Sequence, residues 1–189
     1  PNKDIVKAFD VSLILYAEHS FNVSTFTART ITSSLSDIHG AITGAIASLK
    51  GPLHGGANEE VMHMMNKIKK PEKAHKWINK ALDNKDVIMG FGHRVYKSGD
   101  SRVPTMREYF GKVAKIKKDK KFEKIYDIVE KVMIDRKNIH PNVDYPTGPT
   151  YHLMGFDTDF FTPIFVISRI TGWSAPVSYT HLTLPTRCL

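Results

Sequence analysis

The chain has 189 residues, of which 41% are hydrophobic, and a formal net charge of +8. This length can bury one sizeable core, and the ordinary apolar fraction excludes a disordered protein. No apolar run reaches the roughly 20 residues of a membrane-spanning helix. The single cysteine, Cys188, excludes a disulfide framework, a Cys-rich metal site and a cysteine nucleophile. We therefore expect a globular protein of the cytoplasm that binds acidic ligands.

Three helices are predicted at the start of the chain. Residues 4–20 carry apolar side chains at helical spacing, and residues 21–35 follow with Asn22 and Ser24 as candidate N-caps. Residues 36–49 are rich in glycine and alanine, and such small side chains let another backbone approach closely. This composition predicts a buried helix that packs against a neighbouring helix or subunit.

Four more helices are predicted in the middle of the chain. A Gly/Pro break opens residues 51–70, whose helix carries acid in its first turn and lysine at its end, as the helix dipole favours. Residues 71–84 form a short helix, and residues 103–116 and 121–138 follow a glycine-rich loop. We interpret the lysines of residues 112–131 as a solvated helical face, with a nucleic-acid or membrane patch as the alternative.

The last part of the chain changes character. Residues 140–156 are turn-rich and lead into a helix, and residues 162–173 are the last segment with a helical pattern. No segment alternates with period two for more than a few residues, so the sequence predicts an all-α fold. Residues 176–189 lack a helical period, and we expect a foreign tail there, outside a core of residues 1–175.

Three loops each present one titratable side chain among Gly, Pro or Asn at the edge of a predicted helix: His54, His93 and Asp144. Loops held by a rigid scaffold commonly carry reactive groups, and two imidazoles with a carboxylate suit acid–base chemistry near neutral pH. Taken singly, each residue is more often a hydrogen-bonding or capping residue. The contexts of the three loops therefore decide their interpretation.

Five strings occur along the chain in the order AEHSFNVSTFTAR, GPLHGGAN, GFGHRVYKSGDSR, PNVD and TPIFVISRITGW. Together they resemble the hallmark motifs of the citrate synthase family, from Pro1 to about Ala175. The resemblance implies the multi-helical all-α fold of that family. Because the family's chains are about twice this length, we expect a carboxy-terminal part with the amino-terminal half missing.

The resemblance implies a role for each of the three titratable residues. Asp144 matches the base that removes a proton from the carbon next to an acyl-CoA thioester. His54 matches the donor to the thioester oxygen, and His93 matches the donor to the ketone oxygen of oxaloacetate. A weak carboxylate base succeeds in such chemistry only when the developing oxyanion meets a preorganised donor.

The resemblance also implies binding residues. The oxaloacetate dianion needs cationic partners, and the family positions that contact it match His19, Arg102 and Arg169. For coenzyme A, the matching positions are Val87, Ile88, Met89, Gly90 and Phe91, with Lys97 as a phosphate contact. No metal site and no cofactor are expected, since the thioester is itself the substrate.

We therefore predict condensation of propionyl-CoA or acetyl-CoA with oxaloacetate to give 2-methylcitrate or citrate and free CoA. The stretch that begins at PNVD and ends at RITGW, residues 141–173, looks closer to the methylcitrate-type and bacterial dual-activity members. Two alternatives are a non-catalytic helical module that binds CoA or polyanions, and part of a citryl-CoA lyase. We expect a homodimer at full length, with no nucleic-acid or membrane partner, and an inactive polypeptide when residues 1–189 stand alone.

Overall fold

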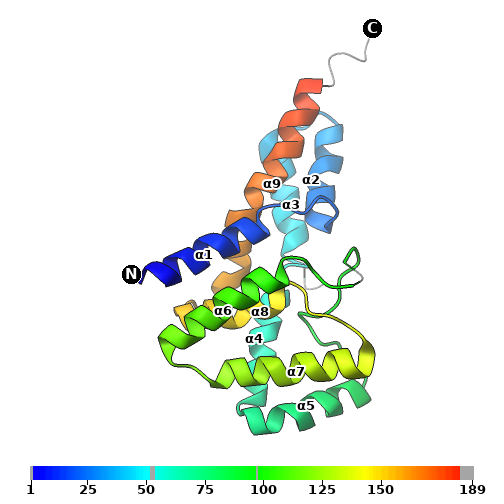
Figure 1. The fold of residues 1–189 in the computed structure, drawn as a ribbon. Helices are drawn as coiled ribbons and strands as arrows, with labels where there is room; N and C mark the ends of the chain where they lie inside the picture. The colour runs from blue at the N-terminus through cyan, green and yellow to red at the C-terminus, as the bar shows by residue number, and fades with distance from the viewer. Residues whose placement is uncertain (1, 52–53, 97, 184–189) are drawn as a thin grey trace. The chain divides into compact units, whose positions relative to one another are not determined.

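The computed structural model describes residues 2–51, 54–96 and 98–183, with side chains through residue 181. Within this part of the chain there is no strand, which confirms the all-α prediction (Figure 1). The helices are α1 (Lys3–Tyr16), α2 (Val23–Ser33), α3 (Ile38–Leu49), α4 (Ala57–Ile68), α5 (Pro71–Asp83), α6 (Val103–Lys117), α7 (Lys121–Lys137), α8 (Asp144–Met154), the 3₁₀ turn η1 (Thr158–Phe160) and α9 (Phe161–Thr183).

The chain divides into two compact units. The larger unit contains the residues through Ser12 together with Ala57–Phe161. The smaller unit contains Leu13–Gly56 together with the residues from Thr162 onward. Each unit has its own packed interior and its own share of the predicted site residues.

Helix α8 is the buried centre of the larger unit. It packs against α4 and α6, while α7 packs against α4, α5 and α6. The Tyr145 ring lies 4.3 Å from the ring centroids of both Phe91 and Tyr126, and its hydroxyl donates to the Tyr126 carbonyl. This aromatic cluster joins α8 to α7 and to the glycine-rich loop, which carries His93.

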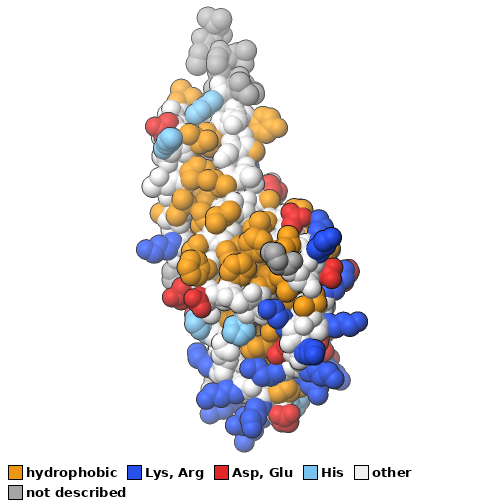
Figure 2. Space-filling model, turned by 90° about the vertical axis from the view of Figure 1, so that its left-hand side faces the viewer, with side chains coloured by type: hydrophobic (Ala, Val, Ile, Leu, Met, Phe, Trp, Pro, Cys, Tyr) orange, Lys and Arg blue, Asp and Glu red, His pale blue; other side chains and the backbone are white. Residues whose placement is uncertain are grey.

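The lysines of residues 112–131 lie exposed on α6, α7 and their connection, as the solvated-face interpretation predicts. Figure 2 shows Lys and Arg side chains gathered over the larger unit and more hydrophobic side chains over the smaller unit. Exposed apolar residues of the smaller unit include Phe21, Val23 and Phe26 on and before α2. The two units therefore differ in surface chemistry as well as in fold.

In the smaller unit, α2 packs against α3, and α9 packs closely on the segment that follows α1. A Cβ atom on Gly172 would lie 2.4 Å from the Ala17 carbonyl oxygen, so glycine is required at this contact. Asn22 is the N-cap of α2, because its side chain accepts from the Thr25 N–H. Asn22 was one of the two predicted caps, and the other, Ser24, lies inside the first turn.

The expected end of helical structure near residue 175 is wrong, because α9 continues to Thr183. Val177 stands one turn after the buried Trp173 and is itself buried, so the apolar face of α9 extends past Pro176. The Thr180 hydroxyl donates to the Pro176 carbonyl, four residues back, a bond that is typical of Ser and Thr in helices. Residues 184–189 of the expected tail lie outside the described residues.

A substitution on α8 tests its close packing against α4. A Cβ atom on Gly148 would lie 2.7 Å from the Asn58 carbonyl oxygen, so Gly148→Ala is expected to lower the free energy of unfolding by about 1–3 kcal/mol. Gly111→Ala on α6 is the matched control. It meets only side-chain atoms at 3.5 Å or more and should raise stability by about 0.5–1 kcal/mol. Urea unfolding measures the change in the free energy of unfolding for both variants, which should be a decrease for Gly148→Ala and an increase for Gly111→Ala.

Candidate active site

The glycine-rich loop that carries His93 is pinned to the segment before α8. The Gly92 N–H donates to the His140 carbonyl at 2.8 Å, and the Asn142 N–H donates to the Gly90 carbonyl at 2.9 Å. Gly90 has a φ of 85°, and a Cβ atom there would lie 2.6 Å from the Val61 side chain. These contacts hold the loop against α4 and α8 and explain why its glycines are needed.

His93 is held in one tautomer by the backbone that follows it. The Val95 and Tyr96 N–H groups donate to His93 Nδ1, at 3.1 and 3.3 Å. Burial and the neighbouring Arg102 charge lower the pKa of His93, so the ring is neutral near pH 7. With Nδ1 as the acceptor, Nε2 carries the proton, and His93 is therefore a neutral hydrogen-bond donor through Nε2.

Asp100 and Arg102 form a buried ion pair beside this loop. The Asp100 carboxylate accepts from Arg102 Nε at 2.9 Å, from Arg102 Nη2 at 2.8 Å and from the Val143 N–H at 3.0 Å. Burial alone would raise the pKa of Asp100, but the bonds and charge of Arg102 and the Val143 N–H lower it below its ordinary value. Asp100 thus orients the Arg102 guanidinium and ties it to the segment that leads to Asp144.

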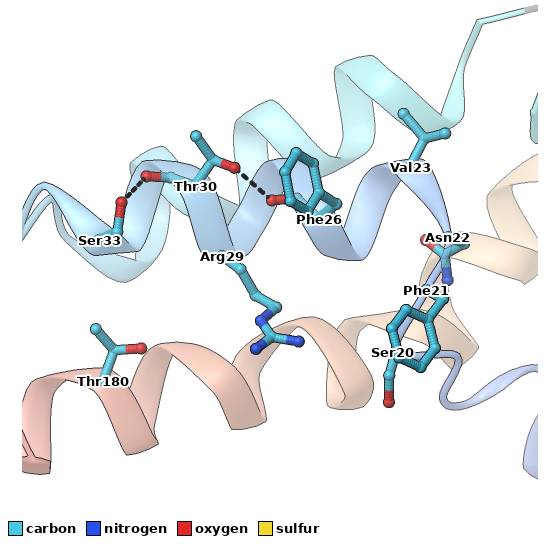
Figure 3. A pocket seen from close by; sticks show the side chains of 9 residues that line it. All are labelled: Ser20, Phe21, Asn22, Val23, Phe26, Arg29, Thr30, Ser33 and Thr180. Atoms are coloured by element: carbon cyan, nitrogen blue, oxygen red, sulfur yellow. Dashed lines mark hydrogen bonds between the residues drawn. The ribbon is translucent and has the colours of Figure 1, made fainter.

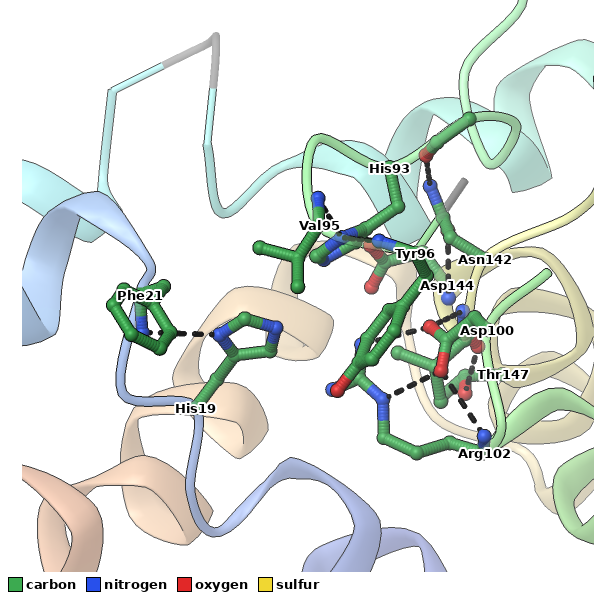
Figure 4. Close-up of polar contacts among 12 residues, drawn as sticks. His19, Phe21, His93, Val95, Tyr96, Asp100, Arg102, Asn142, Asp144 and Thr147 are labelled. Carbon is green, nitrogen blue, oxygen red and sulfur yellow. Dashed lines mark hydrogen bonds and ion pairs between the residues drawn. The ribbon is translucent and has the colours of Figure 1, made fainter. Parts of the chain in front are cut away.

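Asp144 is the first residue of α8, where the helix dipole favours an anion. It is half-buried, and its N–H donates to the Asn142 side-chain oxygen at 3.0 Å. Figure 4 shows His93, Arg102 and Asp144 on neighbouring segments of the larger unit, joined by the hydrogen bonds of Asp100 and Asn142. The larger unit therefore brings a carboxylate, a neutral imidazole donor and a guanidinium together.

In the smaller unit, His54 sits in a hydrogen-bond chain with two buried side chains. Trp173 Nε1 donates to the Ser24 hydroxyl oxygen at 3.2 Å, and that oxygen lies 2.9 Å from His54 Nε2. The Ser24 backbone N–H, which can only donate, also points at His54 Nε2, at 3.3 Å. Nε2 is therefore the acceptor, and the proton of the neutral ring lies on Nδ1.

Burial, followed by the Arg169 charge, lowers the pKa of His54 to about 4. Near pH 7 the ring is therefore neutral. A neutral imidazole can stabilise a developing oxyanion by donating a hydrogen bond, without transferring its proton. His19 and Arg169 lie in the same unit and are also buried. Phe21 N–H donates to His19 Nδ1 at 3.3 Å, and Arg169 donates through Nε to the Tyr16 carbonyl with its guanidinium over the Phe165 ring.

The lowered pKa of His54 has a consequence for stability. The unfolded state binds the proton near pH 6.5 and the folded state only near pH 4, so stability should fall as the pH drops through this window. In His54→Gln the loss of stability between pH 6.5 and pH 4 should be smaller, because the imidazole with the lowered pKa is removed. Free energies of unfolding of the wild type and of His54→Gln, measured at several pH values, check this.

A pocket of about 380 Å³ in the larger unit contains part of the segment predicted to bind CoA. It is lined by Leu82, Lys85, Asp86, Val87, Ile88, Phe91, Met133, Lys137 and Ile139. Three of the five predicted residues, Val87, Ile88 and Phe91, line it, whereas Met89 and Gly90 do not. Lys97, the predicted phosphate contact, lies outside the described residues.

A second pocket, of about 680 Å³, lies in the smaller unit between α2 and α9. Figure 3 shows the Arg29 side chain extending from α2 towards α9, and the exposed Phe21 also lines the pocket. None of the predicted catalytic or substrate-binding residues lines this pocket.

Among the described residues, no three His, Cys, Asp or Glu side chains form a group that could hold a metal ion. No described helix is long and apolar enough to cross a membrane.

Sequence reasoning missed the partners of the predicted residues. Trp173 and Ser24 are 149 positions apart, and no local pattern indicates that their hydrogen bond orients His54. Asp100 lies in the motif GFGHRVYKSGDSR and Asn142 lies in PNVD. Their places in these motifs were the available sequence signal that the two residues matter. Their function as links between loops follows only from the contacts.

The family model for the carboxy-terminal domain of citrate synthase matches residues 1–183. The chain belongs to the citrate synthase family. It is 60% identical over 172 residues to 2-methylcitrate synthase 2 of Corynebacterium glutamicum, covering 91% of this chain and 45% of that protein. It is 54% identical over 177 residues to a citrate synthase of Mycolicibacterium smegmatis, covering 94% of this chain and 47% of that protein. The chain thus spans about half the length of these curated relatives.

Solved structures of the citrate synthase family have the same fold. Citrate synthase from Thermotoga maritima superposes with a TM-score of 0.86 at 37% identity, covering 94% of this chain and 49% of that one. The ternary complex of Thermoplasma acidophilum citrate synthase with carboxymethyl coenzyme A and oxaloacetate superposes with a TM-score of 0.87 at 35% identity, covering 100% of this chain and 51% of that one. A citryl-CoA lyase from Hydrogenobacter thermophilus, at 23% identity and a TM-score of 0.79, shows likeness of fold alone. The family assignment made from the five sequence motifs is confirmed.

Proposed function

We propose that the protein to which this chain belongs condenses an acyl-CoA with oxaloacetate and releases CoA. The observations that carry the proposal are a neutral imidazole donor and a carboxylate at a helix N-terminus in the larger unit, and a neutral imidazole of the opposite tautomer in the smaller unit. His54 presents Nδ1–H, His93 presents Nε2–H and Asp144 begins α8. Two donors and one base are what an enolisation followed by addition to a ketone requires.

In the proposed reaction, Asp144 removes a proton from the α-carbon of the thioester. His54 Nδ1–H donates to the enolate oxygen that forms. The α-carbon then attacks the ketone carbon of oxaloacetate, and the negative charge on the ketone oxygen is stabilised by His93 Nε2–H. Hydrolysis of the thioester by water finally yields the tricarboxylate and the free thiol of CoA.

Cationic side chains would bind the dianion. Arg169 is only 2% exposed, and a buried guanidinium is costly unless an anion or several acceptors compensate it. Arg102 is held by Asp100 in a defined orientation. Together with His19, these residues are the proposed oxaloacetate ligands. The reaction as proposed uses the CoA thioester as a substrate and needs no cofactor.

The acyl chain is proposed to be propionyl in preference to acetyl. The 60% identical relative of Corynebacterium glutamicum is named a 2-methylcitrate synthase, which supports this choice. One methylene in an apolar pocket is worth only about 1–3 kcal/mol, so both thioesters should react at different rates.

A homodimer is part of the proposal. Helix α3 buries Ala41, Ala45 and Leu49 within the smaller unit, while Ile38 at its first turn and Ile46 are 40% and 39% exposed. A second copy of the chain is the proposed cover for these two exposed side chains. Sedimentation equilibrium measures the association state directly.

Release of CoA thiol with oxaloacetate tests the proposed function. We would assay the chain itself and a chimera in which residues 1–175 replace the matching segment of the Corynebacterium glutamicum 2-methylcitrate synthase 2. We expect the chimera to release CoA, faster with propionyl-CoA than with acetyl-CoA, and the chain alone to be inactive. A chimera that is folded and dimeric but silent with both thioesters would contradict the proposal.

The pocket beside α5 and α7 is proposed to bind the adenosine end of CoA. Its apolar walls, Ile88 and Phe91, suit a base, and Lys85 and Lys137 suit a phosphate. Lys137→Glu is expected to weaken CoA binding by about 10-fold or more without changing oxaloacetate binding. Lys131→Glu, the same charge change at an exposed position of α7, is the control. Calorimetric titration with CoA compares them, and equal affinities in the two variants would argue against this pocket.

A further inference from the structure

The Asn142 side chain joins two segments that the proposed chemistry needs in register. Its Nδ2 donates to the Gly92 carbonyl at 3.0 Å, and its Oδ1 accepts from the Asp144 N–H at 3.0 Å. Its own backbone N–H donates to the Gly90 carbonyl at 2.9 Å. Gly92 directly precedes His93, so Asn142 is bonded next to both the proposed base and the proposed ketone-polarising residue (Figure 4).

The two side-chain bonds leave one orientation for the amide. A carbonyl such as that of Gly92 can only accept, and an N–H such as that of Asp144 can only donate. If the amide were flipped, both contacts would become unfavourable pairs. Asn is therefore the residue type that this position requires, since it offers a donor and an acceptor on one short side chain.

A second side-chain link, through Asp100, joins the segment before α8 to a different residue. Asp100 accepts from the Val143 N–H and holds Arg102, so it connects the segment before α8 to the proposed oxaloacetate ligand. The Asn142 amide instead connects that segment to the residue before His93. The Asn142 amide thus adds a side-chain bond next to His93 to the two backbone bonds, Gly92 N–H to His140 and Asn142 N–H to Gly90, that join these segments.

We propose that Asn142 is a positioning residue that holds the base Asp144 in register with His93. This inference rests on the proposed condensation. It adds a residue that acts through Asp144 and His93 and not by contact with the substrates. Near-attack geometry is demanding, and displacement of a reacting group by about 1 Å can cost about 10²-fold in rate. Loss of the link should therefore lower kcat and leave substrate binding nearly unchanged.

Asn142→Asp separates this role from simple helix capping. A carboxylate at residue 142 still accepts from the Asp144 N–H, and it caps the N-terminus of α8 at least as well. It cannot donate to the Gly92 carbonyl, so the side-chain bond to the residue before His93 is lost while the backbone bonds between the two segments remain. A purely structural capping role predicts unchanged activity, whereas the positioning role predicts a loss.

The variants would be made in the active chimera and assayed for CoA release. Asn142→Asp and Asn142→Ala are both expected to lower kcat by about 10–100-fold with KM values for both substrates within about threefold of the wild type. Asn138→Asp, which adds the same charge at an exposed position four residues earlier, should keep the wild-type kcat. Retention of kcat within about threefold in Asn142→Asp, or a loss carried by KM alone, would overturn the proposal.

A measurement on the unmodified chain keeps the inference testable if a variant does not fold. In the wild-type chain, the side-chain amide protons of Asn142 should exchange with solvent at least about tenfold more slowly than those of exposed Asn138. Equal exchange rates would overturn the proposed link. A wild-type chimera without condensing activity would contradict the proposed function itself, whereas an active one with unaffected Asn142 variants would contradict the positioning role alone.

Discussion

Replacing Asp144 by Asn is expected to lower kcat for CoA release by about 10³-fold, because general-base catalysis contributes about 10²–10⁴-fold. Asn keeps the size of Asp at the first residue of α8 but cannot take a proton from carbon. The melting temperature and the KM for oxaloacetate should therefore stay near their wild-type values.

The matched control for this variant is Asp135→Asn, on the exposed side of α7. It makes the same chemical change in the same unit and should keep full activity. Initial rates of thiol release by the chimera compare the two variants. A kcat for Asp144→Asn within about tenfold of the wild type would mean that another group removes the proton.

Replacing His54 by Ala is expected to lower kcat by about 10²–10³-fold, since loss of one oxyanion donor costs that much in other acyl-transfer enzymes. Ser24→Ala should give a smaller loss. The Ser24 backbone N–H, which also donates to His54 Nε2, remains in that variant and continues to favour the proton on Nδ1. The order of the two effects is thus part of the prediction.

His63→Ala, an exposed histidine on α4, is the control for His54→Ala and should be fully active. Both variants can be compared by single-turnover thiol release, which separates chemistry from product release. If Ser24→Ala were as inactive as His54→Ala while still folded, the backbone N–H would not maintain the tautomer. If His54→Ala kept its rate, the proposed oxyanion donor would be wrong.

The helices and the residue types at the site could be predicted from the sequence because both depend on local pattern. Helices α6 and α7 begin and end within a residue of the predicted ranges, and His93 and Asp144 were recognisable from the motifs around them. The continuation of α9 past Pro176 was missed, since burial of Val177 depends on packing and a proline usually indicates a break.

The links between residues could not be predicted in the same way. The tautomer of His54 depends on Ser24 and Trp173, which are brought to it by α2 and α9. The orientation of Asn142 depends on Gly92, 50 positions earlier in the chain. Such hydrogen bonds follow from tertiary contacts, and a single sequence carries no spacing rule that would indicate them.

The most direct test of the account is the mass of the product formed from oxaloacetate and acetyl-CoA that carries three deuterium atoms on its methyl group. Enolisation by Asp144 removes one deuteron, and carbon–carbon bond formation then retains the other two. The account predicts that the chimera forms citrate with two deuterium atoms and one equivalent of CoA, and that Asp144→Asn forms both about 10³-fold more slowly. Release of CoA together with acetate that keeps all three deuterium atoms would show simple thioester hydrolysis and would contradict the account.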